Sequence, residues 1–249
     1  MSETPVQNPQ KPPVPPKVTY RLRYTKEEGI RFVGHLDMMR LLQRAARMAE
    51  LPLAYSAGFN PHPLISLSAP LPLGMTSGGE YADMTLTGPF PEGEALERLN
   101  RCLPRGVHML GVTRLKPKAV NVMACVAAAR YRLACPAGTP LDKLAAALPA
   151  YLAQTEIWVE KTTKRKTETV DVRPDIFELK VTEDGLELLL AAGASRTLKA
   201  ALAVENFFAF AGVELDWLAC RCCRVDLLRQ QEETLLPLDR GEAAEEFGA

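Results

Sequence analysis

Strand-like and helix-like hydrophobic patterns follow one another in the same order twice along this chain of 249 residues. Alternating apolar positions over 18–24 predict a strand, and apolar positions at helical spacing over 36–49 predict a helix. Further strands at 53–56, 64–69, 80–86 and 107–115, with a helix at 91–103, complete a β-α-β-β-α-β order. This order is typical of a ferredoxin-like, or split βαβ, unit.

The second part of the chain repeats this order without visible residue-by-residue identity. Its predicted strands cover 131–135, 156–162, 170–172, 176–181, 186–191 and 214–228, and its predicted helices cover 141–152 and 198–211. The fold class is therefore expected to be α+β, with two tandem ferredoxin-like lobes that have antiparallel sheets. The lobes are expected at 17–116 and 130–230, with a connector at 117–129 between them. Disorder is expected for the Pro-rich residues 1–16 and for the acidic tail at 231–249.

Charge is segregated along the chain although the total is balanced. The sequence contains 30 Lys and Arg and 30 Asp and Glu, yet residues 17–47 hold eight basic and three acidic residues. Six cysteines without a secretory leader, and no apolar run of membrane-spanning length, predict a reduced, soluble, cytoplasmic protein with no membrane partner.

Three groups of cations suggest a polyanionic ligand, because guanidinium and ammonium groups bind phosphates. One group lies at helical spacing on 36–49, one is expected on the face of strand 18–24 opposite its apolar residues, and one forms a cationic hairpin in the second lobe. A solvated helix face with an exposed hairpin tip is the alternative interpretation. The candidate nucleic-acid-binding residues are Arg21, Arg23, Arg40, Arg44, Arg47, Lys161, Lys164, Arg165 and Lys166.

Two of the three histidines, His35 and His62, lie in the stretch 32–80 and are candidate acid–base residues. Their spacing matches no metal-binding pattern, so no metal site is expected. A local structural role for His35 is the alternative. A nucleotide-sized pocket is expected beside them, and its aromatic side chains could stack unpaired bases. The candidate pocket residues are Asp37, Tyr55, Ser56, Phe59, Asn60 and Glu80.

Several familiar catalytic patterns do not occur in the sequence. The chain has no phosphate-binding loop of the G-x-x-x-x-G-K-[ST] type and no G-x-G-x-x-G. Cys220, Cys222 and Cys223 form C-x-C-C, which is not the C-x-x-x-C-x-x-C of radical S-adenosylmethionine enzymes. These cysteines are therefore expected to be structural residues of a buried strand.

The blocks FVGHLDMMR, AELPLAYSAGFNPHP and PLPLGMTSGGE, together with VDVRP at 170–174, closely resemble the DUF2344 family of radical-SAM-associated proteins. The resemblance covers about residues 17–230 and weakens after residue 115. Members of that family occur as separate chains or fused to a radical S-adenosylmethionine domain. The resemblance thus implies a radical S-adenosylmethionine protein as partner. That partner would carry the iron–sulfur cluster and S-adenosylmethionine, and this chain would carry no cofactor.

These observations lead to one expected function and two alternatives. The expected function is an accessory RNA-binding or substrate-presenting protein, without activity of its own, that acts with a radical S-adenosylmethionine enzyme in tRNA or rRNA modification. The first alternative is an RNA-processing enzyme with His35 or His62 as general base. The second is a structural module whose PLPLG segment at 70–74 docks a protein.

Overall fold

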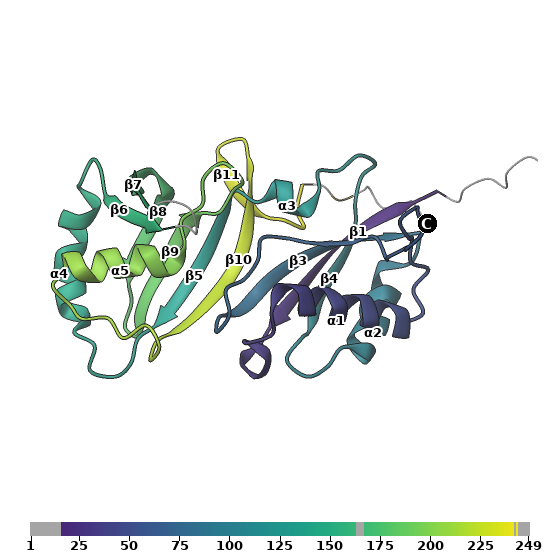
Figure 1. Ribbon diagram of the computed structural model, residues 1–249, viewed down its shortest axis with the longest axis horizontal. Helices are drawn as coiled ribbons and strands as arrows, with labels where there is room; N and C mark the ends of the chain where they lie inside the picture. The colour runs from purple at the N-terminus through teal and green to yellow at the C-terminus, as the bar shows by residue number, and fades with distance from the viewer. Residues whose placement is uncertain (1–15, 163–166, 242, 244–249) are drawn as a thin grey trace, which may run out of the picture.

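The computed structural model describes residues 16–162, 167–241 and 243 (Figure 1). This part is a mixed α/β fold with a large, mostly antiparallel sheet, a two-stranded sheet and five α-helices. The elements of the first half are β1 (Val18–Lys26), α1 (His35–Met48), β2 (Ile65–Leu67), β3 (Thr76–Leu86), α2 (Glu92–Cys102) and β4 (Met109–Arg114). The remaining elements are α3 (Val122–Cys125), β5 (Ala128–Ala134), α4 (Leu141–Leu152), β6 (Trp158–Thr162), β7 (Thr167–Asp171), β8 (Ile176–Val181), β9 (Gly185–Ala191), α5 (Ala200–Phe210), β10 (Arg221–Gln231) and β11 (Thr234–Pro237).

The large sheet continues from one half of the molecule into the other. Its strands lie in the order β4-β1-β3-β10-β5-β9-β8, with β2 beside β3 and β11 beside β10. The pairs are antiparallel except at β3 and β10, where Thr76 and Ser77 lie opposite Cys223 and Arg224 in a parallel pair. We call this contact the seam. Antiparallel sheets were expected for the two lobes, and the structure has one large sheet that continues through both halves and is antiparallel except at the seam.

Two features of β3 explain why β10 can pair with it. Strand β2 contacts only the end of β3 around Ala82–Met84, so the edge near Ser77 is free to pair. Gly79 then lets β10 come close, because a Cβ there would lie 2.7 Å from an Asp226 oxygen and 3.1 Å from the Val225 carbonyl oxygen. A larger residue at this position would push the strands apart.

The first hydrophobic core lies between the strands and two helices. Tyr20 and Leu22 alternate along β1 and meet Met38 and Leu42 of α1, while Leu99 enters from α2. The helix begins after Gly34, and Asp37 in its first turn suits the helix dipole. Near the end of α1, Ala46 is buried whereas Met48 is exposed.

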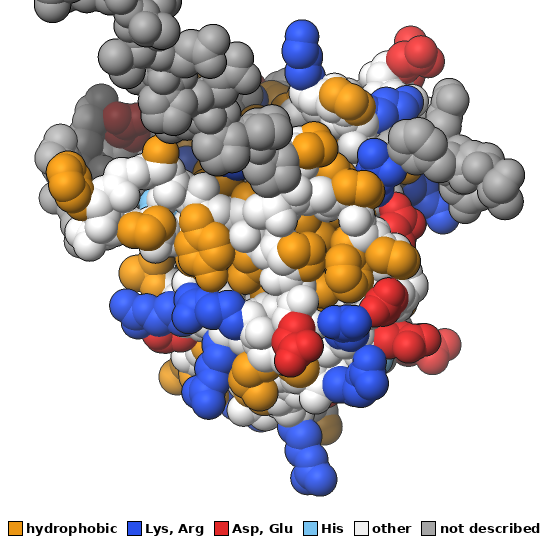
Figure 2. Space-filling view, turned by 90° about the vertical axis from the view of Figure 1, so that its right-hand side faces the viewer, with side chains coloured by type: hydrophobic (Ala, Val, Ile, Leu, Met, Phe, Trp, Pro, Cys, Tyr) orange, Lys and Arg blue, Asp and Glu red, His pale blue; other side chains and the backbone are white. Residues whose placement is uncertain are grey.

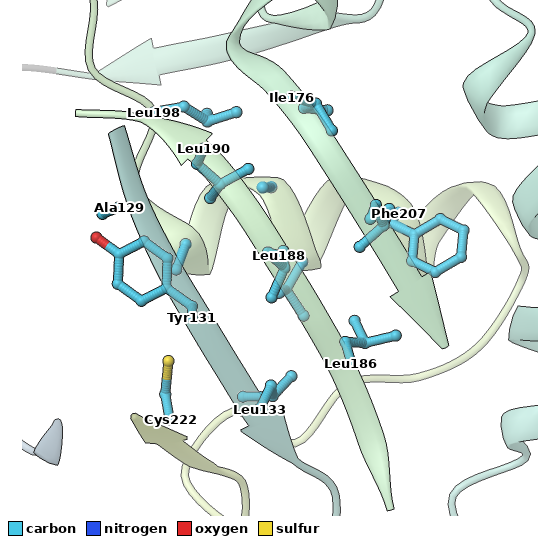
Figure 3. Packing of buried hydrophobic residues seen from close by; sticks show 14 of the residues in the cluster. Ala129, Tyr131, Leu133, Ile176, Leu186, Leu188, Leu190, Leu198, Phe207 and Cys222 are labelled. Atoms are coloured by element: carbon cyan, nitrogen blue, oxygen red, sulfur yellow. The ribbon is translucent and has the colours of Figure 1, made fainter. Parts of the chain in front are cut away.

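The second hydrophobic core belongs to β5, β8 and β9, covered by α4 and α5. Figure 3 shows Tyr131 and Leu133 of β5 beside Leu188 of β9, with Phe207 of α5 and Cys222 of β10 in the same cluster. The predicted limits 141–152 and 176–181 coincide with α4 and β8. The hairpin formed by β6 and β7 makes a separate two-stranded sheet.

The C-terminal segment is more regular than expected. Residues 234–237 form β11 instead of belonging to a disordered tail that starts at 231, and Leu238 is fully buried in the second core. The expected connector at 117–129 contains α3, whose first turn is capped by the Asn121 side chain, and the start of β5. The expected disordered residues 1–15 lie outside the described part. Within that part, no helix is long and apolar enough to cross a membrane.

Candidate nucleic-acid interface

The loop at 55–63 is closed at its base by a small set of hydrogen bonds. The Ser56 backbone N–H donates to the His62 carbonyl at 2.9 Å, and the Ser56 hydroxyl lies 2.9 Å from His62 Nδ1. The His62 N–H donates to that hydroxyl at 3.1 Å, and Tyr55 pairs with Pro63 in an isolated bridge. The prolines of the loop restrict its backbone further. Phe59 at its tip is 106% exposed, so this loop presents a free aromatic ring.

A groove beside this loop encloses about 760 Å³. It is bordered by His62, by the start of β1 and by the segment after β4. Lys17, Lys116 and Lys118 line it, are exposed and have no ion pair within the described part of the chain. Asp83 also lines the groove, but its carboxylate is bound by Arg21. The groove therefore carries a net positive charge.

The outer face of α1 adds further cations. Arg44 and Arg47 are exposed and, among the described residues, take part in no ion pair. Arg40 is also exposed, but it pairs with Asp37 at 3.0 Å, so Asp37 neutralises an arginine instead of lining a pocket with His35. Figure 2 shows one end of the molecule, where hydrophobic side chains gather in the middle and Lys and Arg side chains lie beside and below them.

Arg21 and Arg23 do not lie on an open surface, contrary to the expectation for strand 18–24. Arg21 is fully buried, forms a bidentate pair with Asp83 at 2.8 and 3.0 Å, and donates to the carbonyls of Leu238 and Val120. The C-terminal segment and the segment before α3 cover this second face of β1. The guanidinium of Arg21 is consequently a structural group and has no donor left for phosphate.

Arg23 is half-buried at the same covered face. It donates to Asp226 of β10 at 2.6 Å and lies 3.8 Å from Asp239. Tyr81 donates to the other oxygen of Asp226 at 2.7 Å. Burial raises the pKa of Asp226, and the hydrogen bond from Tyr81 and the charge of Arg23 oppose that effect. Arg23 therefore links β1 to β10.

His35 lies in a second, much smaller cavity of about 20 Å³. Tyr24, Lys26 and Glu80 line the same cavity, and Glu80 is paired with Arg224 of β10 at 2.5 Å. Burial lowers the pKa of His35, and the charge of Arg224 adds to this effect while that of Glu80 opposes it. This cavity is too small for a nucleotide.

Lys26 also lines this cavity, and its pKa is shifted as well. Its ammonium is buried and donates to the Arg31 carbonyl at 2.9 Å. Burial lowers the pKa of Lys26, and Glu80 opposes this shift. A buried cluster of perturbed groups is typical both of catalytic sites and of structural ion-pair networks.

The residues that were expected to form a single pocket therefore lie in three different places. His62, Ser56, Tyr55, Phe59 and Asn60 belong to the loop at 55–63, and His62 also borders the large groove. His35 and Glu80 share the small cavity, whereas Asp37 lies on the surface of α1. The two histidines thus line different cavities.

A further groove of about 730 Å³ lies in the second half between the β6–β7 hairpin and the start of α5. Lys161 lines it beside Trp158, and its ammonium lies 3.5 Å from the Thr197 carbonyl. Acidic side chains, including Glu160 and Asp171, line the same groove, so its charge is mixed. The other expected cations of this hairpin, Lys164, Arg165 and Lys166, lie outside the described residues.

The VDVRP segment holds the end of β7 in place. Asp171 accepts hydrogen bonds from the N–H groups of Ile157 at 2.8 Å and Arg173 at 2.9 Å, and these bonds lower the pKa of its carboxyl. The Arg173 guanidinium donates to the Leu152 carbonyl at the end of α4. These contacts fasten the hairpin to α4.

The three cysteines at 220–223 lie just before β10 and in its first residues. Cys220 and Cys222 are buried and belong to the second core, and burial raises the pKa of Cys222 to about 12. Cys223 is half-buried. No group of three or more His, Cys, Asp or Glu side chains that could hold a metal ion occurs in the described ranges.

Five important residues of these sites were not predicted from the sequence. Lys17, Lys116 and Lys118 were missed because their grouping depends on how the chain returns to the start of β1. A K-x-K pattern at 116–118 is the sequence signal that could have indicated two of them. Lys26 and Arg224 were missed because nothing in a strand pattern indicates a buried charge.

The fold and these surfaces together define a mixed α/β protein with a cationic groove beside an exposed aromatic loop. The chain belongs to the family described as "Uncharacterized protein conserved in bacteria (DUF2344)", whose model matches residues 19–200. This match confirms the resemblance carried by the motifs at 32–80, and the description names no activity. A search of curated proteins found no match.

Proposed function

We propose that this chain is an accessory RNA-binding or substrate-presenting subunit that works with a radical S-adenosylmethionine enzyme in the modification of tRNA or rRNA. The observation that carries the RNA part is the cationic groove at Lys17, Lys116 and Lys118 beside the exposed Phe59. Exposed cations bind a phosphate backbone, and exposed aromatic rings stack on unpaired bases. The radical enzyme rests on the family resemblance, and it would bring the iron–sulfur cluster and S-adenosylmethionine.

We further infer that each half is a ferredoxin-like unit, with the two units in tandem over 17–116 and 130–230. In the first half β3 separates β1 from β2, and β1 separates β3 from β4. In the second half β9 separates β5 from β8, and β5 separates β9 from β10. Each helix-linked strand pair is thus split by another strand, which supports this inference.

A partner surface is suggested by exposed apolar side chains around the start of α1. Phe32, Leu36 and Leu73 are each more than three-fifths exposed, and the Gly74 N–H donates to the Arg31 carbonyl at 3.1 Å, which brings the PLPLG segment to this loop. Exposed apolar patches of this kind are typical of protein contacts. This observation favours a docking role for PLPLG, either within the proposed function or as the structural module considered above.

The enzymatic alternative has less support. A general base needs reach to a substrate, yet His35 lies in the small cavity, and His62 Nδ1 is engaged by Ser56. Replacing each histidine by alanine in an assay reconstituted with the modifying enzyme tests this alternative. Unchanged turnover in both variants excludes it, and a loss of turnover with retained RNA binding would support it.

RNA binding measured against salt tests the proposal. Fluorescence anisotropy with a labelled RNA hairpin should show affinity that falls steeply as salt rises, because bound cations release counterions from the RNA. The K116A/K118A and R44A/R47A variants should each have a shallower slope of log affinity against log salt. The slope should decrease in magnitude by about 0.7 for each lost contact with a phosphate of a single strand. The K143A/K180A variant, with the same charge change in the second half, should keep the wild-type slope.

Two results would contradict the proposal. One is the absence of binding by a folded sample at low salt, and the other is binding whose affinity does not depend on salt. Affinity purification from cells, with bound RNA and proteins identified together, tests the partner. Recovery of a protein with a C-x-x-x-C-x-x-C motif supports the radical enzyme, and recovery of RNA without such a protein contradicts that part.

A further inference from the structure

We propose that the loop at 55–63 selects unpaired nucleotides, with one base stacked on Phe59 and its flanking phosphates held in the groove by Lys17, Lys116 and Lys118. This inference rests on the proposed RNA binding and specifies the kind of RNA that is bound. According to this inference, the recognised segment is single-stranded, such as the loop of a hairpin. A paired stem would be bound only through its phosphates, by the cationic side chains.

The first argument is the position of Phe59. Its side chain is 106% exposed, so it makes no packing contact that would explain an apolar ring at this place. The loop that carries it is nevertheless closed by the Ser56–His62 hydrogen bonds and stiffened by Pro61 and Pro63. Because the backbone that carries the ring is already restricted, little backbone freedom is lost when a base stacks on Phe59.

The second argument is the surroundings of the ring. His62 belongs to the closed base of the loop and also borders the groove, so the ring and the three lysines belong to adjoining surfaces. The groove encloses about 760 Å³, which lies within the range of about 300–1,000 Å³ typical of small-ligand sites. The exposed Asn60 on the loop adds a polar side chain that could contact a base edge.

The third argument distinguishes an unpaired strand from a duplex and from a protein. The bases of an A-form duplex are stacked in the helix, and its deep major groove is closed to side chains, so Phe59 could not reach a ring face there. The groove next to Phe59 combines apolar side chains such as Leu64 and Ile65 with three lysines that have no ion pair in the described structure, and those cations favour a polyanionic strand over an uncharged protein surface. A positively charged groove combined with an aromatic side chain for stacking is typical of single-strand binding.

The test compares two RNAs of the same stem sequence, a hairpin with an unpaired loop and a fully paired duplex, in the full-length protein. Phe59→Ala and Phe59→Leu should weaken hairpin binding by about 5- to 100-fold and leave duplex binding unchanged. Phe59→Trp should restore hairpin binding, because it restores an aromatic ring. Phe177→Ala removes a partly exposed phenylalanine of the second half and serves as the matched control.

A 2-aminopurine base in the hairpin loop reports the stacking itself. Its fluorescence should be quenched on binding to the wild type and to Phe59→Trp, and the quenching should be lost with Phe59→Leu. Equal affinity of hairpin and duplex, or hairpin binding unaffected by Phe59→Ala, would overturn the inference while RNA binding stands. The inference is also wrong if Phe59→Ala prevents a protein from co-purifying with this chain but leaves the affinity for the hairpin unchanged. If neither RNA binds to folded protein, the proposed function fails first.

Discussion

At the scale of single residues, buried charges at the seam determine how the two halves fit together. Arg224 is 2% exposed, and its guanidinium binds both oxygens of Glu80, at 2.8 and 2.5 Å, and the carbonyl of Ala69 at 2.8 Å. Its own carbonyl accepts a hydrogen bond from the Ser77 hydroxyl at 2.9 Å. These four contacts reach into the first half, so they fix the register of β10 against β3, while Tyr131 of β5 is a further hydrogen-bond partner of Arg224 from the second half.

Removing Arg224 should therefore be costly. Arg224→Ala leaves the Glu80 carboxylate buried without its partner, and we expect a loss of about 3–5 kcal/mol in the free energy of unfolding, measured by urea titration. The double variant E80L/R224M should recover much of this loss, because it removes both charges. Arg221→Ala is the control, since Arg221 is exposed and should cost less than about 1 kcal/mol. A loss for Arg224→Ala as small as that of the control would contradict this explanation.

His35 should make stability depend on pH. Burial lowers the pKa of His35 below its ordinary value of 6.5, with Arg224 adding to the shift and Glu80 opposing it. The unfolded chain then binds the proton more tightly, so stability is lost as the pH falls below 6.5 and through the folded-state pKa. Urea titrations at about pH 7.5 and about pH 5.5 measure how much free energy of unfolding is lost between these two pH values. This loss should be smaller for His35→Asn than for the wild type.

An NMR titration of the histidine ring protons gives an independent measurement. The His35 resonance, assigned by its absence from His35→Asn, should titrate below pH 6.5. Lys26, Glu80 and Arg224 are the charged groups that face this cavity or act on it. A His35 resonance that titrates above its ordinary value would show that Glu80 outweighs burial and Arg224.

At the scale of elements, sequence patterns located helices and strands well where the packing is local. The limits 141–152 and 176–181 match α4 and β8, and 36–49 differs from α1 by one residue at each end. In each case the apolar side chains of the element pack against other elements of the same half, so their spacing in the sequence reveals the buried face. The stripe of Arg40, Arg44 and Arg47 was likewise predicted from helical spacing, and all three residues are exposed on α1.

Contacts between distant segments could not be read from these patterns. The alternation of apolar and polar residues along β1 distinguishes the two faces of the strand. It does not show that another segment covers the polar face, so Arg21 was expected to be exposed. Its cover comes from Val120 and Leu238, which lie 99 and 217 residues away in the sequence. The separation of His35 and His62 into different cavities has the same cause, because β2 and the loop before it are positioned by pairing with β3.

The segment after β11 should contribute strongly to stability. Leu238 is fully buried in the second core, and its carbonyl accepts a hydrogen bond from Arg21 at 2.9 Å. Leu238→Ala should lower the free energy of unfolding by about 2–5 kcal/mol, because it leaves a cavity. Leu218→Ala, at a position that is 89% exposed, is the matched control and should change stability by less than about 0.5 kcal/mol. Equal effects of the two variants would mean that the segment does not pack as described.

At the scale of the whole molecule, the seam predicts a single unfolding transition. Both tryptophans, Trp158 and Trp217, lie in the second half, so their fluorescence reports that half alone, whereas far-UV circular dichroism reports both. Because one sheet and the Arg224–Glu80 pair join the halves, the two signals should change at the same urea concentration. Transitions at separate urea concentrations would show that the halves unfold independently.

The order of contacts along the chain has a consequence for folding during synthesis. Glu80 meets Arg224 across 144 residues, and Arg21 meets Leu238 across 217 residues. At a synthesis rate of about 5–20 residues per second, Asp83 is made about 8–30 seconds before Leu238, and Arg21 is made earlier still. During that interval the second face of β1 and the free edge of β3 are uncovered, and such strand edges favour aggregation. We therefore expect a nascent chain of this protein to be prone to aggregation until its last strands emerge.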